Sequence, residues 1–146
     1  MRRNASTMNT FTINKTDFGI DLEESSASIE TVDGVDTLTL EINGDEAVHD
    51  AISEDEDSEW SWTAYPPRLY LYEFPMTREG DLLKATLTLD DLNEYEAAIY
   101  MMEHNDMDGV EISLNAKGEL RIEGTVFLLG ETHPFSILYQ MSENAA

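Results

Sequence analysis

Apolar and polar residues alternate one by one along much of this chain. Residues 37–43 show the pattern most clearly, because Leu38, Leu40 and Ile42 are separated by threonine and glutamate. Successive side chains of a strand point to opposite faces of a sheet, so a period of two predicts strands with one face in a core and one in solvent. The pattern therefore favours a β-rich fold.

Similar patterns recur in residues 83–89, 110–114, 120–128 and 135–141, and in shorter form in 11–13, 18–22 and 29–32. Residues 110–114 and 120–128 flank the turn-forming sequence Asn-Ala-Lys-Gly at 115–118, which predicts a β-hairpin. Residues 69–74 are apolar on both faces, which is typical of a central or doubly covered strand.

One segment has a helical period instead. Asp91 and Glu94 have the spacing of an N-terminal capping box. An apolar stripe follows in Leu92, Tyr95, Ile99 and Met102. We expect one main helix at about residues 91–104, and residues 45–52 are a candidate for a second, short helix. The predicted class is α+β and β-rich: a single antiparallel sheet or a sandwich of about 7–9 strands with one main helix.

Length and composition predict a single domain. The chain has 146 residues, of which 41% are hydrophobic, enough for a core, and it contains no internal repeat or long linker. We expect a flexible N-terminal tail at 1–9, a globular domain at 10–142 and a C-terminal tail at 143–146. The chain contains no cysteine, and no apolar stretch resembles a signal peptide or a membrane helix, so we expect a cytoplasmic protein.

Negative charge is concentrated in one part of the chain. The formal net charge is −23, and residues 16–67 contain 16 aspartates and glutamates with no lysine or arginine. The densest part is Glu54–Asp57 with Glu59, and Trp60 and Trp62 follow directly. Repulsion among so many like charges lowers the stability of a compact fold, so we interpret the charge as serving partner recognition or solubility.

Several classes of function lack the residues that they require. Nucleic acids and anionic membranes are bound through clustered lysine and arginine, of which this chain has only 8 in total. There is no G-x-S-x-G elbow, no glycine-rich nucleotide loop, and no histidine spacing suited to zinc. We therefore expect a protein that is not an enzyme and has no cofactor or metal.

Residues 104–115 partly mimic a calcium-binding loop. Asp106, Asp108 and Gly109 occupy its third, fifth and sixth positions. His104 stands at the first position, where a carboxylate is needed, and Asn115 replaces the closing glutamate. A plain turn between a helix and a strand is the stronger interpretation.

The acidic run with its aromatic border is the strongest candidate binding site. Carboxylates on a surface loop would attract a basic protein, and aromatic side chains would supply the buried contacts that hold it. The candidate partner-binding residues are Asp45, Glu46, Asp50, Glu54, Asp55, Glu56, Asp57, Glu59, Trp60, Trp62 and Tyr65. In the alternative interpretation the run is a solvated loop and the tryptophans belong to the core.

We expect a small acidic inhibitor that neutralises a basic protein partner. The concrete form is an immunity protein or antitoxin whose carboxylates cover the positively charged active site of a toxin. The alternative is an acidic β-sandwich domain with a structural or adaptor role in a salt-adapted organism, in which the acids only maintain solubility.

Overall fold

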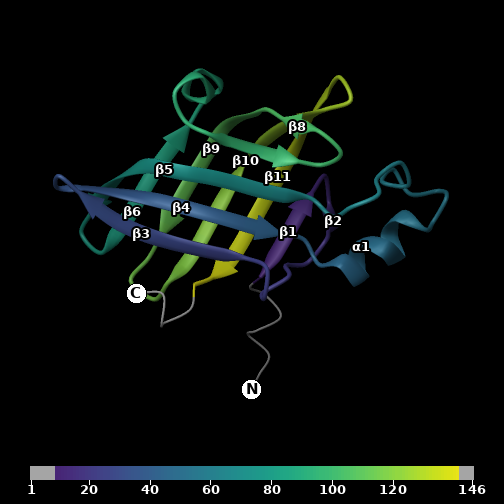
Figure 1. Ribbon diagram of the computed structural model, residues 1–146, viewed down its shortest axis with the longest axis horizontal. Coiled ribbons are helices and arrows are strands. Elements are labelled where there is room, and N and C mark those ends of the chain that lie inside the picture. The colour runs from purple at the N-terminus through teal and green to yellow at the C-terminus, as the bar shows by residue number, and fades with distance from the viewer. Residues whose placement is uncertain (1–8, 142–146) are drawn as a thin grey trace.

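The alternating segments form one antiparallel sheet that curls back over itself (Figure 1). The structure is a computed structural model that describes residues 9–141. Its elements in chain order are β1 (Thr10–Ile13), β2 (Thr16–Asp17), β3 (Ser26–Val32), β4 (Val35–Asn43), α1 (Glu46–Ser53), β5 (Arg68–Glu79), β6 (Leu82–Leu87), the 3₁₀ turn η2 (Leu89–Asn93), β7 (Ala97–Tyr100), β8 (His104–Asn105), β9 (Met107–Leu114), β10 (Glu119–Leu128) and β11 (Glu131–Gln140).

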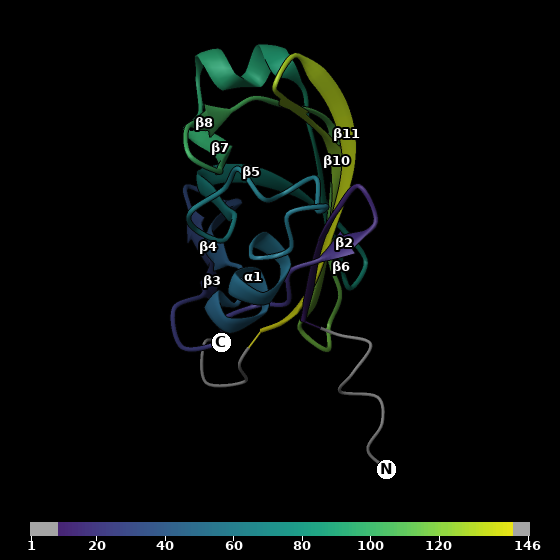
Figure 2. The ribbon, with the colours of Figure 1, turned by 90° about the vertical axis from the view of Figure 1, so that its right-hand side faces the viewer.

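The strand order is β2-β1-β11-β10-β9-β6-β5-β4-β3, and β7 pairs with β5 and with β8. The 12-residue strand β5 joins the two halves of the curl, because its start pairs with β4 and β7 and its end pairs with β6. Near its middle, Glu73 has a positive φ of 52°, and Tyr72 and Glu73 lie opposite the single residue Thr39. This bulge bends the strand. Figure 2 shows the two halves as walls that face each other across the core.

The alternating apolar residues of the strands are buried in the core, as predicted. Leu38, Leu40 and Ile42 of β4 are each at most 1% exposed. The predicted hairpin is present: β9 and β10 pair with Leu114 opposite Leu120. In its turn the Asn115 carboxamide oxygen accepts hydrogen bonds from the backbone amides of Lys117 and Glu119.

The helix predicted at 91–104 is wrong. The capping box is formed by Thr88 and Asp91 and opens only the 3₁₀ turn η2. Residues 97–100 then form strand β7, which pairs with the start of β5, and Ile99 is fully buried. Isolated short helices are marginal in water, so hydrogen bonding to β5 together with burial of Ile99 prevails over the helical period. Met102, at the end of the predicted stripe, is 40% exposed.

Three smaller expectations have mixed outcomes. The short helix suggested at 45–52 is confirmed as α1. Residues 18–22 are not a strand, although Phe18 is fully buried. Strand β5 is central in the sheet, between β6 and β4, as one of the two alternatives predicted. It is covered on one face only, because Leu69 and Leu71 are buried whereas Tyr72 is 37% exposed.

The tails expected at 1–9 and 143–146 lie outside the described residues, except for Asn9. The carboxamide oxygen of Asn9 accepts a hydrogen bond of 3.1 Å from the backbone amide of Gln140. Residue 9 therefore belongs to the folded part of the chain.

Candidate functional site

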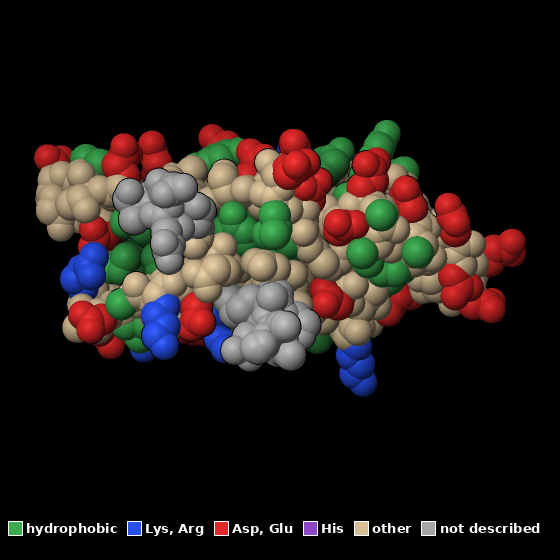
Figure 3. Space-filling view, turned by 90° about the horizontal axis from the view of Figure 1, so that it is seen from below, with side chains coloured by type: hydrophobic (Ala, Val, Ile, Leu, Met, Phe, Trp, Pro, Cys, Tyr) green, Lys and Arg blue, Asp and Glu red, His purple; other side chains and the backbone are tan. Residues whose placement is uncertain are grey.

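Helix α1 and the loop after it project from one end of the molecule (Figure 1). We call residues 45–65 the acidic lobe, because they contain eight aspartates and glutamates and no lysine or arginine. Figure 3 shows acidic side chains gathered over this end, whereas most lysine and arginine side chains visible in that view lie toward the opposite end. The acidic segment of the sequence is thus a distinct feature of the surface.

Helix α1 begins at Asp45, whose carboxylate caps it by accepting a 2.9 Å hydrogen bond from the Val48 amide. Glu46 in the first turn interacts favourably with the positive end of the helix dipole. Glu54 at the other end is in an unfavourable position, because the C-terminus carries partial negative charge and the last turn contains no basic residue. Helix stability therefore does not explain the acids at the end of α1.

The loop after α1 is a series of tight turns. The Asp55 carboxylate accepts a hydrogen bond from the Asp57 amide, and the Asp55 carbonyl accepts one from the Ser58 amide. The Ser58 hydroxyl oxygen then accepts a 3.0 Å hydrogen bond from the Trp60 amide. These local bonds hold the densest acidic run in a defined shape.

Trp60 attaches the lobe to the core. It is only 3% exposed, and its ring meets that of Phe18 edge-on at 5.5 Å between centroids. His133 of β11 lies on another side, with its ring centroid 6.4 Å away. Trp60 is therefore not available as a surface anchor for a partner, and for this tryptophan the core interpretation applies.

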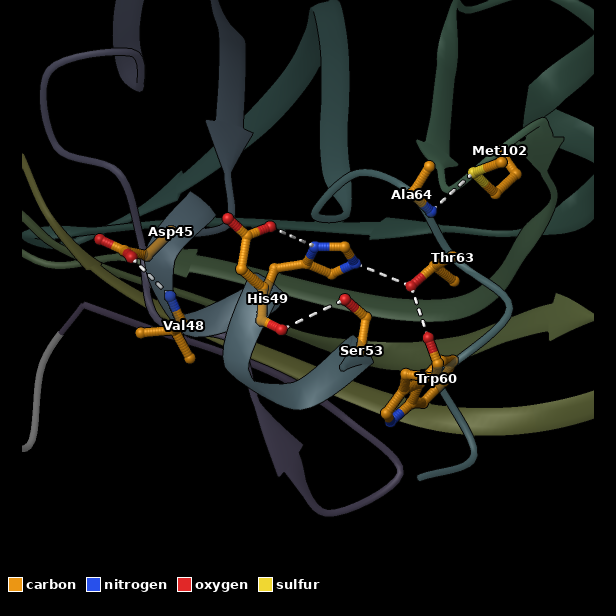
Figure 4. Close-up of polar contacts among 9 residues, drawn as sticks. Asp45, Val48, His49, Ser53, Trp60, Thr63, Ala64 and Met102 are labelled. Carbon is orange, nitrogen blue, oxygen red and sulfur yellow. Dashed lines mark hydrogen bonds and ion pairs between the residues drawn. The ribbon is translucent and has the colours of Figure 1, made fainter. Parts of the chain in front are cut away.

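His49 ties α1 to the loop. Its Nε2 atom lies 2.7 Å from the Thr63 hydroxyl oxygen, and that hydroxyl donates its own hydrogen to the Trp60 carbonyl at 2.7 Å (Figure 4). A hydroxyl has one hydrogen to donate, so Nε2 of His49 must carry the proton that Thr63 accepts. Burial lowers the pKa of His49, and the carboxylates of Asp50 and Glu46 oppose this shift in part.

The carboxylates of the acidic lobe face solvent. Asp45 is half-buried, and the other seven acids are exposed. Within residues 9–141, no lysine or arginine nitrogen lies within ion-pair distance of any of them. The Glu59 carboxylate accepts a 3.1 Å hydrogen bond from the Asn14 carboxamide. The negative charge of the lobe is therefore not neutralised by the described part of the chain.

Two aromatic residues of the candidate set do face outward. Trp62 is 37% exposed and Tyr65 is 64% exposed. The exposed acids of the lobe and these two rings are thus combined on one projecting element.

A groove that was not predicted from the sequence lies beside the lobe. Leu129, Glu131 and His133, from the β10–β11 turn and the start of β11, line it together with Glu59 and Trp62. These two groups lie about 70 positions apart in the chain, so no local pattern connects them. One signal was present in the sequence: after Leu128, the alternation of β10 directs Leu129 away from the core.

The segment that resembles a calcium loop is occupied by strands. Residues 104–105 form β8 and residues 107–114 form β9. The Asp108 carboxylate already accepts hydrogen bonds from the backbone amides of Leu89 and Gly109. No group of three His, Cys, Asp or Glu side chains within residues 9–141 has a metal-binding arrangement.

Comparisons with protein families, curated proteins and solved structures found no match for this chain. Over residues 9–141, no helix has the length and apolar character needed to cross a membrane.

Proposed function

We propose that this protein is a small acidic inhibitor that binds a basic protein and blocks its positively charged active site. The most concrete form is an immunity protein or antitoxin that acts by binding and not by catalysis. The observation that carries the proposal is the acidic lobe: an anchored projection whose carboxylates, all exposed except Asp45, form no ion pair with any lysine or arginine of the described chain.

Anchoring supports this mode of binding. Binding by a mobile acidic tail would lose the entropy of ordering that tail, whereas a preformed surface avoids most of this loss. Trp60, His49 and Thr63 hold the lobe through buried contacts, so the backbone that carries its carboxylates is anchored. Carboxylates presented in this way can take the place of the phosphates or other anions that a basic active site handles.

Charge and aromatic contacts have separate roles in the proposal. The lobe carboxylates steer the partner and raise the association rate, up to about 10⁸ M⁻¹ s⁻¹ at low salt. Trp62 and Tyr65 then slow dissociation, because exposed aromatic side chains bury a large area at a small entropic cost. The lack of cysteine suits a reducing compartment, so we place this binding in the cytoplasm.

The alternative is an acidic structural or adaptor domain of a salt-adapted organism. The small number of lysines supports it, and 15 further acids lie in residues 68–146. The concentration of acids without bases in residues 16–67 favours the inhibitor, since a general adaptation to salt would distribute them more evenly.

The first experiment is capture of binding proteins by the immobilised chain from lysate of its source organism, followed by a salt gradient. A single basic protein retained beyond about 0.5 M salt, and losing its own activity in the complex, is expected, because apolar contacts persist when charge is screened. A set of ribosomal and other basic proteins that all elute at low salt would contradict the inhibitor and support the alternative.

Two charge-matched variants show where the binding charge lies. The lobe variant combines Glu54→Gln, Asp55→Asn, Glu56→Gln and Asp57→Asn. The control variant removes four exposed charges elsewhere, with Asp33→Asn, Asp81→Asn, Asp90→Asn and Glu94→Gln. The lobe variant should slow association by about tenfold or more at low salt, and the control variant by much less. Equal slowing would mean that only net charge matters.

A further inference from the structure

We propose that the groove between the acidic lobe and the β10–β11 turn receives an arginine side chain of the basic partner. This inference rests on the proposed function and specifies its central contact. We call this site the turn groove, and its walls are Glu59, Trp60, Trp62, Leu129, Glu131 and His133.

The turn groove combines an apolar surface with negative charge. Trp62 on one wall is 37% exposed and Leu129 on the other is 68% exposed, so both offer apolar area to a ligand. The Glu131 side chain is 79% exposed, and Glu59 is also exposed. No lysine or arginine is among the residues that line the groove. A ligand that fits both properties has apolar methylenes and a cationic end.

Leu129 is in an unusual backbone conformation. Its φ is 50°, and that of the following Gly130 is 80°, so two successive residues of the β10–β11 turn are left-handed. Hairpin turns of this kind favour asparagine, aspartate or glycine, and a leucine there is energetically unfavourable. An exposed leucine in a turn that disfavours it adds nothing to the stability of the monomer, and its side chain is free to contact a partner.

Arginine fits the turn groove better than lysine. A guanidinium group is flat, stacks on an indole face, and is less strongly hydrated than an ammonium group. Trp62 supplies the indole, and the Glu59 and Glu131 carboxylates can accept hydrogen bonds from the N–H groups of the guanidinium. The methylenes of the arginine would cover Leu129. His133 also lines this wall, with its Nε2 atom 3.9 Å from the Glu131 carboxylate.

Titration with two peptides tests the proposal on the full chain. Hexa-arginine and hexa-lysine carry the same charge, and the two indole N–H signals in a ¹⁵N-labelled sample belong to Trp60 and Trp62. At about 150 mM salt, hexa-arginine should shift the Trp62 indole signal and the Leu129 amide signal saturably. Its affinity should exceed that of hexa-lysine by about threefold or more.

Substitutions locate the contact. Leu129→Asn suits the left-handed turn, so it should fold normally and yet weaken hexa-arginine binding by about tenfold. Leu22→Asn removes another exposed leucine, which does not line the groove, and should leave affinity unchanged. Trp62→Leu should remove the preference for arginine over lysine. The groove assignment is overturned by equal affinity for the two peptides, by equal affinity of Leu129→Asn and Leu22→Asn, or by the absence of saturable shifts at Trp62.

The captured partner separates this inference from the proposed function. If wild type and Leu129→Asn retain the same basic protein to the same salt concentration, the inhibitor stands and the turn groove is rejected. If the groove discriminates the peptides but no basic protein is retained from lysate, the inhibitor is rejected and a local arginine-binding site remains.

Discussion

The Nε2 atom of His49 lies 2.7 Å from the hydroxyl oxygen of Thr63, and both side chains are buried. This contact joins α1 to the loop that returns toward β5, so it closes the base of the acidic lobe. Because Thr63 also donates to the Trp60 carbonyl, a single buried chain of hydrogen bonds connects the helix to the tryptophan that enters the core. The position of the carboxylates depends on this small neutral network.

The network makes stability depend on pH through His49. Burial lowers its pKa in the folded protein, so between this lowered value and the ordinary value near 6.5 the unfolded chain binds more protons. The contribution of His49 to the free energy of unfolding is therefore complete above about pH 6.5 and is lost as the pH falls. The loss is at most about 1.4 kcal/mol per pH unit.

Urea unfolding of the wild type and of His49→Gln between pH 5 and 8 measures this effect. Glutamine can still donate to Thr63 but does not titrate, so the destabilisation caused by the substitution should shrink as the pH falls from 7 to 5. Carboxylates titrate in both proteins, and their contribution cancels in the difference. A difference that is constant with pH would show that His49 does not gain a proton on unfolding.

The two tryptophans should respond differently to truncation. Trp60→Ala leaves a cavity beside Phe18 and should lower the free energy of unfolding by about 3–5 kcal/mol. Trp62→Ala removes a partly exposed ring and should cost about 1 kcal/mol or less. Urea denaturation monitored by far-ultraviolet circular dichroism compares them directly. Similar losses for both would contradict the assignment of only Trp60 to the core.

Neutralising the acidic run should stabilise the isolated protein. The variant with Glu54, Asp55, Glu56 and Asp57 converted to amides removes repulsion and the unfavourable charge at the end of α1, so we expect a gain of about 0.5–1 kcal/mol at low salt. The gain should nearly vanish in 0.5 M salt, because exposed charges are then screened. Thermal unfolding at the two salt concentrations is the measurement, and a destabilised variant would mean that the carboxylates support the fold.

Gly124 lies at an irregularity between β9 and β10, where a side chain would meet the backbone. A Cβ atom there would approach the Val110 Cα to 2.9 Å and the Asp108 carbonyl oxygen to 3.2 Å. We expect Gly124→Ala to cost about 1–3 kcal/mol.

Gly80 provides the comparison, because a Cβ there meets nothing within 4 Å and only the positive φ of 63° is unfavourable. Gly80→Ala should cost about 1 kcal/mol. Denaturant titration of both variants distinguishes a clash from backbone strain, and equal costs would count against the close approach at Gly124.

Much of the sheet could be predicted from local pattern. In β4 the inward residues Leu38, Leu40 and Ile42 are visible as alternation, and the turn at Asn115–Gly118 has the residues that such a turn requires. At residues 91–104 the local pattern is ambiguous, because Ile99 is a buried residue both in the predicted helical stripe and in strand β7. The strand forms because residues 97–100 pair with the start of β5. No local pattern shows this pairing, because β5 begins more than 20 positions earlier in the chain.

The candidate site was predictable in its charge but not in its contacts. The acidic run and Tyr65 are exposed as the sequence suggested. The different positions of Trp60 and Trp62 depend on Phe18 and His133, which come from distant parts of the chain. The turn groove also requires the β10–β11 turn to lie beside the lobe.

The sequence by itself determined the β-rich class, the faces of most strands, and the segregation of acids into one segment, because period-two burial and charge are local properties. Tertiary structure decided that residues 97–100 extend the sheet, that Trp60 is buried while Trp62 is not, and that Leu129 lies beside the acidic lobe. These outcomes depend on hydrogen bonding and packing between residues far apart in the chain. Such contacts contribute to stability only once the curled sheet has brought the residues together.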